Sequence, residues 1–109
     1  MEPRKRKIFH YVSGVGIDRF SESVSKIKDV RGRAAINKRM DRVSEGLLGD
    51  HHYLGAGVWE LRIDFGPGYR IYYGEDGLAI ILLLAGDKGS QTKDIRHAHA
   101  LWADYRRAQ

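Results

Sequence analysis

Two arginines, a lysine and a tyrosine in this sequence have the types and spacing of a phosphate-binding site. Arg62 lies on the polar side of an alternating segment, and Arg70 lies on the polar side of the segment that returns after a Gly-Pro-Gly turn. Because side chains alternate between the two faces of a strand, both guanidiniums are expected on one face of a sheet. Tyr72 shares that face, and Lys88 lies where the neighbouring strand ends. Guanidiniums bind phosphate through paired hydrogen bonds and stabilise the charge that develops in phosphoryl transfer.

The same residues allow a second interpretation that needs no ligand. Arg62 would then pair with Glu60 or Asp64, and Arg70 would occupy a solvated face. Like charges at facing positions of neighbouring strands repel each other, which favours a site that receives an anion. The spacing by itself leaves both interpretations open.

Other motifs support fewer kinds of chemistry. His51 and His52 are neighbours in a β-prone segment and would point to opposite faces, so they do not form a metal-binding pair. One of them, if it lies near the arginines, could contact phosphate or transfer a proton. The glycine-rich turns at 55–57 and 66–68 lack the Lys-Ser/Thr sequence of a nucleotide-binding P-loop. The absence of cysteine excludes disulfides and thiolate chemistry and suits a reducing cytosol.

The elements that position these residues begin with two helices. Apolar residues at positions 17, 20, 24 and 27 form one helical face, and Gly32 is expected to break this pattern. A second helix carries an apolar stripe between residues 36 and 47, and glycines mark its end. Together the two helices predict an αα-hairpin. The outer face of the second helix carries the cations Lys38, Arg39 and Arg42.

After residue 50 the apolar period changes from 3.6 to 2. Alternation over 58–65 and 69–73, and an apolar run over 78–85 after an Asp-Gly turn, predict a three-strand meander. Short strands are expected at 8–12 and 51–54, and a final helix over 91–107. We therefore expect one α+β domain spanning 1–109. Its small antiparallel sheet would have the helices, an N-terminal αα-hairpin and a C-terminal helix, packed on one face.

Charge is distributed unevenly along the 109 residues, whose formal net charge is +5. Residues 1–42 hold 12 Lys and Arg against 5 Asp and Glu, whereas residues 43–109 hold 7 against 9. A basic first half favours a polyanion or an acidic protein as partner. No apolar run reaches the roughly 20 residues of a membrane span, and no apolar segment follows the basic N-terminus as in a secretion signal. We expect a cytoplasmic protein with no membrane partner.

A family resemblance is carried by GVWELRI (57–63), GPGYRIYY (66–73), LLLAGDKGSQTKDI (82–95) and a helical segment, 27–43, with the core RAAINKR. In combination these motifs resemble the RelE/ParE toxin superfamily, in its HigB-like, phage-derived branch of addiction module killer proteins. The resemblance extends from about Ile8 to Tyr105.

The resemblance implies the toxin of a type II toxin–antitoxin system with a RelE/ParE-like α+β fold. A small HigA-like helix-turn-helix antitoxin would neutralise it and would be its only link to operator DNA. The implied activity is that of an endoribonuclease that cuts mRNA in the ribosomal A site, inhibits translation and uses neither metal nor cofactor. In that chemistry the 2′-hydroxyl attacks the neighbouring phosphodiester, a base accepts its proton, and an acid protonates the 5′-oxygen.

Site residues follow from the resemblance motif by motif. Arg62 and Arg70 would hold and stabilise the phosphate, and Lys88 takes the place of a basic residue at the end of the last strand. RelE itself has a catalytic tyrosine at the start of its C-terminal tail, whereas residues 92–95 contain none. Tyr72 is the candidate phenol by strand parity, and the general acid and base stay unassigned. The expected RNA-binding residues are His52, Lys38, Arg39 and Arg42.

Two other functions are compatible with the same resemblance, because one fold serves several roles. The first is a ParE-like protein that inhibits DNA gyrase without catalysis. The second is a degenerate toxin that only binds its antitoxin. Since ParE-type members tend to lack the basic set, Arg62, Arg70 and Lys88 favour cleavage.

Overall fold

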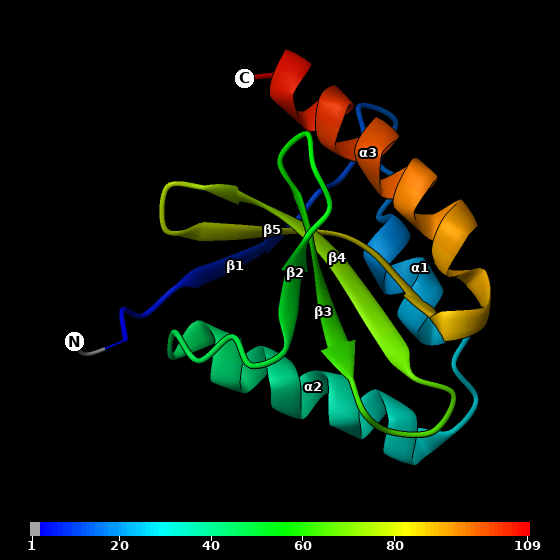
Figure 1. Ribbon diagram of the computed structural model, residues 1–109. Helices are drawn as coiled ribbons and strands as arrows, with labels where there is room; N and C mark the ends of the chain where they lie inside the picture. The colour runs from blue at the N-terminus through cyan, green and yellow to red at the C-terminus, as the bar shows by residue number, and fades with distance from the viewer. Residues whose placement is uncertain (1–2) are drawn as a thin grey trace.

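The computed structural model describes residues 3–109, and over this range five strands and three α-helices build an α+β fold (Figure 1). No helix in that range is long and apolar enough to cross a membrane. In chain order the elements are β1 (Lys7–His10), α1 (Arg19–Ser25), α2 (Val30–Ser44), β2 (His51–Tyr53), β3 (Val58–Ile63), β4 (Tyr69–Asp76), β5 (Ala79–Asp87), the short 3-10 helix η1 (Lys88–Ser90) and α3 (Gln91–Arg107).

The sheet is mixed, with strand order β1-β5-β4-β3-β2. Strands β3 to β5 form the predicted three-strand antiparallel meander, and the expected short strand β2 extends it on one side. Strand β1, however, lies parallel to β5 at the other edge. The prediction of an antiparallel sheet is therefore wrong for its first strand. Alternation in the sequence indicates which side chains share a face, but it carries no information about the direction of a neighbouring strand.

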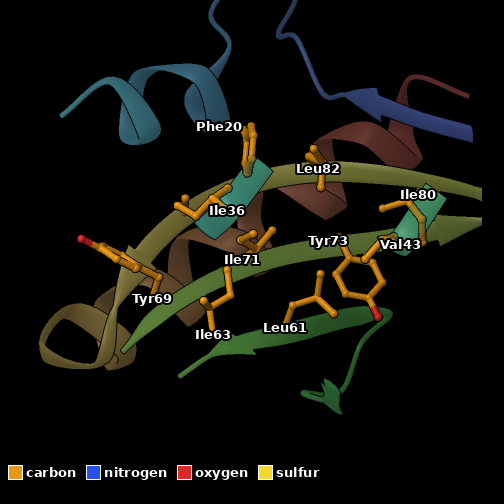
Figure 2. Close-up of a cluster of buried hydrophobic side chains, with 11 residues drawn as sticks. Phe20, Ile36, Val43, Leu61, Ile63, Tyr69, Ile71, Tyr73, Ile80 and Leu82 are labelled. Atoms are coloured by element: carbon orange, nitrogen blue, oxygen red, sulfur yellow. The ribbon is translucent and has the colours of Figure 1, made fainter. Parts of the chain in front are cut away.

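One face of the sheet is covered by α1 and α2. Phe20 from α1 and Ile36 and Val43 from α2 pack on side chains of β3, β4 and β5, among them Leu61 and Ile71 (Figure 2). Each of these helices begins at a capping residue. The carboxylates of Asp18 and Asp29 accept hydrogen bonds from backbone N–H groups in the first turns of α1 and α2.

Gly32 lies inside α2 and does not break the helix, contrary to expectation. It is buried against the ring of Tyr69, and a Cβ at this position would overlap that ring. The interruption between the helices falls instead at residues 26–29. A glycine in a helical pattern thus marks a close approach here, and the helix begins at the capping aspartate before it.

The other face of the sheet is covered by α3, so the expectation that all helices share one face is wrong. Ala98, Leu101 and Trp102 pack on Val58 of β3, on β4 and on β5. The reason is visible in β5, whose run of apolar residues is buried on both faces and requires two covering layers. The bounds predicted for α3 are confirmed.

Candidate phosphate-binding site

Arg62 and Arg70 face each other across β3 and β4. The two residues are directly paired in the antiparallel register, so their side chains leave the sheet on the same side. This is the side that α3 covers at its other end, where Tyr72 lies beneath the helix. The predicted placement of the two arginines on one face is confirmed.

The two guanidiniums open into a hollow of about 430 Å³ at the end of the sheet. Lys88, exposed at the start of η1, contributes to the same wall. The 66–68 turn closes the hollow on one side, and the carboxylates of Asp50 and Asp64 stand at its rim. Three cations from three different segments therefore meet around one concave surface.

A buried carboxylate lies beneath the arginines. Glu60 has no exposed surface, and its Oε1 accepts a hydrogen bond from Nε of Arg62 at 2.6 Å and lies 3.8 Å from Nε of Arg70. Its Oε2 accepts a hydrogen bond from Nε2 of Gln91 at 2.9 Å. The hydrogen bond to Glu60 raises the pKa of Arg62 above its ordinary value, so this guanidinium stays charged.

The ligand-free interpretation of the arginines is correct for Arg62 and wrong for Arg70. Arg62 does pair with Glu60, as that interpretation requires. Arg70 does not occupy a solvated face, because it is only 9% exposed and its Nε has no hydrogen-bond partner within residues 3–109. Glu60 supplies one negative charge beneath two guanidiniums, and Lys88 adds a third cation, whereas Asp50 and Asp64 supply two further negative charges to the lining. The hollow thus offers three cations to an anion, although its lining as a whole is close to neutral.

Tyr72 does not reach the hollow. Its side chain is fully buried beneath α3, and its hydroxyl has no hydrogen-bond partner among the described residues. Burial, reinforced by Glu60 and Asp94, raises the pKa of Tyr72 far above its ordinary value, so the phenol stays neutral. Strand parity placed this residue on the correct face, but the covering helix removes it from any contact with a ligand.

His52 lies at the margin of the site. It pairs with Glu60 across β2 and β3, and its Nε2 is 2.7 Å from Oδ1 of Asp50. Asp50 itself lines the hollow. The imidazole is half-buried and held in one orientation next to the cations, whereas His51 turns to the opposite face and packs on Trp59.

None of the basic residues of α2 lines the hollow, although Arg39 binds the backbone of two residues that do. Arg39 donates hydrogen bonds to the backbone carbonyls of Leu48, Asp50 and Arg62 at 2.8 to 2.9 Å, so it joins α2 to β3 and to the segment before β2. Burial, followed by the nearby charge of Arg42, lowers its pKa. Lys38 and Arg42 are exposed on α2. Because α2 covers the face opposite to the arginine side chains, the structure does not bring this predicted RNA-binding set together with the site.

Comparison with known proteins identifies a relative in Haemophilus influenzae. An "Uncharacterized protein" of Haemophilus influenzae is 45% identical over 83 residues, which cover 75% of this chain and 84% of that protein. The chain belongs to the family of this Haemophilus protein. No family model and no solved structure matches the chain. The name of the Haemophilus relative states no activity, so function has to be inferred from the geometry of the site.

The structure adds Glu60 and Gln91 to the residues around the arginines. The sequence pairs Glu60 with Arg62 only in the interpretation without a ligand, and it gives no signal for Gln91. The alternating pattern predicts that Glu60 lies on the solvated side of an amphipathic strand, and Gln91 is predicted only as the first residue of a helix. The available signal was the pair of facing arginines, since two guanidiniums that leave water together need a counter-charge. Within residues 3–109 no three His, Asp or Glu side chains come together in a metal-binding cluster.

Proposed function

We propose that this protein is a toxin of the RelE/ParE superfamily, in its HigB-like branch, and that it cuts mRNA on the ribosome. The observation that carries the proposal is the direct pairing of Arg62 with Arg70 over a hollow that Lys88 completes. Such an arrangement suits a phosphodiester, because fixed cations on one side of the phosphate stabilise charge on its non-bridging oxygens. The likeness of the surrounding motifs to this superfamily supports the same conclusion.

The reaction requires an attack within the substrate. The 2′-oxygen forms a bond to the neighbouring phosphorus, the bond from phosphorus to the 5′-oxygen breaks, and the products are a 2′,3′-cyclic phosphate and a free 5′-hydroxyl. One proton leaves the 2′-hydroxyl and one reaches the 5′-oxygen. Arg62, Arg70 and Lys88 stabilise the phosphorane charge, with Arg70 at the floor of the hollow. His52, which lies 2.7 Å from a carboxylate oxygen of Asp50 in the lining of the hollow, is a candidate for proton transfer.

The proposed setting is the cytoplasm, where translated mRNA is the substrate. The ribosome would hold the mRNA in the A site while the toxin supplies the cations, so a small open hollow is sufficient for the chemistry. A small helix-turn-helix antitoxin would neutralise the toxin by covering the same surface.

The proposal predicts growth arrest with new mRNA ends in bacteria that express the protein. Wild type is compared with the Arg62→Ala/Arg70→Ala variant, and primer extension maps the ends of a translated mRNA. We expect new 5′ ends in frame with the codons for wild type and loss of both arrest and ends in the variant. Arg106→Ala/Arg107→Ala, which removes two exposed arginines at the far end of α3, is the control and should retain both effects.

Because the double variant leaves the buried Glu60 without its two cationic partners, Lys88→Ala provides a second test at an exposed position. It should lower the yield of new ends at least tenfold while circular dichroism shows an unchanged fold. Arrest without new mRNA ends, together with blocked DNA supercoiling that survives these changes, would replace the proposal with gyrase inhibition. Absence of arrest would leave antitoxin binding as the function.

A further inference from the structure

A series of exposed cations continues from the phosphate-binding hollow around the end of the sheet. Lys26 and Lys28 lie between α1 and α2, Lys88 begins η1, and Lys93 and Arg96 lie in the first two turns of α3. All five are exposed, and none of them forms an ion pair with another residue of the range 3–109. We refer to these five residues as the basic track.

The track follows a chain of connected hollows. Pro67 lines both the hollow of the two arginines and the next hollow, which also contains Lys26 and Lys28. Lys26 lines a third hollow between α1 and α3, and Lys93 lines that hollow together with a fourth that contains Arg96. Each hollow thus shares a lining residue with the one before it, so the four hollows lie next to one another.

The fold gathers these segments at one end of the molecule. The β3–β4 turn, α1 with the segment that follows it, and the start of α3 lie together where β5 leaves the sheet (Figure 1). Carboxylates also lie along these hollows. Glu22 pairs with Arg19, whereas Asp87 and Asp94 accept hydrogen bonds from the neutral Ser90 and keep their charge. The four hollows together are lined by eight Lys and Arg residues and five Asp and Glu residues, so a positive excess is left for a ligand.

The chemistry of the path fits a nucleic-acid backbone better than a protein segment. An acidic protein segment that docks in a groove also buries apolar side chains. The large apolar side chains exposed within residues 3–109 line none of these four hollows. They are Phe9, Val12, Val15, Val30, Leu47, Tyr53 and Leu78.

We propose that the basic track binds the phosphate backbone of single-stranded RNA that continues beyond the phosphate held by Arg62 and Arg70. This inference rests on the proposed nuclease function and extends it, because it specifies the path of the substrate. The strand runs from the arginine hollow past Lys26 and Lys28, then between α1 and α3 toward Lys93 and Arg96. It does not run along α2, which covers the face of the sheet opposite to the arginine side chains.

The test measures binding of a fluorescent, fully 2′-O-methylated 12-nucleotide RNA, which cannot be cut, to the purified full chain at several salt concentrations. Lys26→Ala/Lys93→Ala/Arg96→Ala should weaken affinity at least tenfold at low salt. The slope of log affinity against log salt should fall by about 2, at roughly 0.7 for each phosphate contact of a single strand. The control, Lys5→Ala/Lys7→Ala/Arg106→Ala, removes the same charge at exposed positions outside the four hollows and should change affinity less than twofold.

Four results would overturn the proposal. Equal weakening by both triple variants would show an effect of net charge alone. An unchanged affinity in the track variant, or no binding by wild type, would remove the RNA path. Weakened binding of poly-glutamate with unchanged RNA binding would assign the track to an acidic protein.

The outcomes for the track and for the nuclease are separable. A track variant that loses RNA affinity, beside an Arg62→Ala/Arg70→Ala variant that still produces mRNA ends, supports the track and rejects the catalytic site. Normal RNA affinity in the track variant, with mRNA ends lost in the arginine variant, rejects the track and leaves the catalytic site in place.

Discussion

The charge balance of the candidate site depends on one residue, Glu60. Its carboxylate is fully buried, yet it holds Arg62 by a hydrogen bond and lies near Arg70 and Gln91. A single buried negative charge between two guanidiniums keeps them on the same face without neutralising both of them. Removal of one member of a buried charge cluster is costly because the remaining charges stay where water cannot solvate them.

We therefore predict that Glu60→Ala lowers the free energy of unfolding by about 3 kcal/mol, a moderate value for such a site because the Arg62 side chain is 38% exposed. Tyr72→Phe is the matched control, since Tyr72 faces Glu60 across β3 and β4 and its buried hydroxyl has no partner within the described chain. The loss of an unsatisfied hydroxyl should leave stability within about 0.5 kcal/mol or raise it. Urea unfolding followed by circular dichroism measures both changes.

Other values for the stability of these two variants would revise the description of the site. If Glu60→Ala is as stable as wild type, the guanidiniums have enough solvent or other partners to do without the carboxylate. If Tyr72→Phe lowers the free energy of unfolding by more than about 1 kcal/mol, the Tyr72 hydroxyl has a hydrogen-bond partner. Tyr72 would then be a candidate for the chemistry again.

At the scale of elements, the sequence predicts whether a segment forms a helix or a strand. It predicts less well which other elements that segment packs against. The helix over 91–107 and the meander strands follow from period and turn signals, because local backbone preferences fix them. Two features are not local: the parallel pairing of β1 with β5, and the face on which α3 packs. Both depend on which apolar surfaces meet after the chain collapses, and periodicity does not encode that choice.

The same distinction explains what was predictable in the site. Register parity places Arg62 and Arg70 together because one tight turn connects their strands. The burial of Tyr72 depends on α3, and the binding of Arg39 to three carbonyls depends on how α2 approaches β3. Helices distant in sequence thus decide which members of a polar face remain accessible.

The packing of α3 on the sheet gives a prediction at Gly74. A Cβ at this position would overlap the indole of Trp102, which is almost completely buried. We expect Gly74→Ala to destabilise the protein by about 1–3 kcal/mol through overpacking, measured as a lower midpoint of urea unfolding. Gly14→Ala is the control, because no atom lies within 4 Å of the corresponding Cβ. Equal stability of the two variants would show that α3 moves freely on the sheet.

For the molecule as a whole, the central strands belong to two cores at once. On β4, Ile71 and Tyr73 pack under α1 and α2, and Tyr72 packs under α3. On β5, Leu82 packs in the core under α1 and α2, and Leu83 packs in the core under α3. Loss of either helical layer exposes one side of the same two strands, so the layers cannot unfold independently without a large apolar cost.

The two tryptophans test this coupling, because each reports on one side of the sheet. Trp59 packs beside Tyr73 on the side of α1 and α2, and Trp102 packs beside Tyr105 within α3. In the single-tryptophan variants Trp59→Phe and Trp102→Phe, the urea midpoint from fluorescence should equal the midpoint from circular dichroism of the same variant. Comparison within each variant removes the effect of the substitution on overall stability. If Trp102 fluorescence changed at a lower urea concentration than circular dichroism, α3 would detach first. The walls of the RNA path would then be less rigid than the arginine pair on β3 and β4.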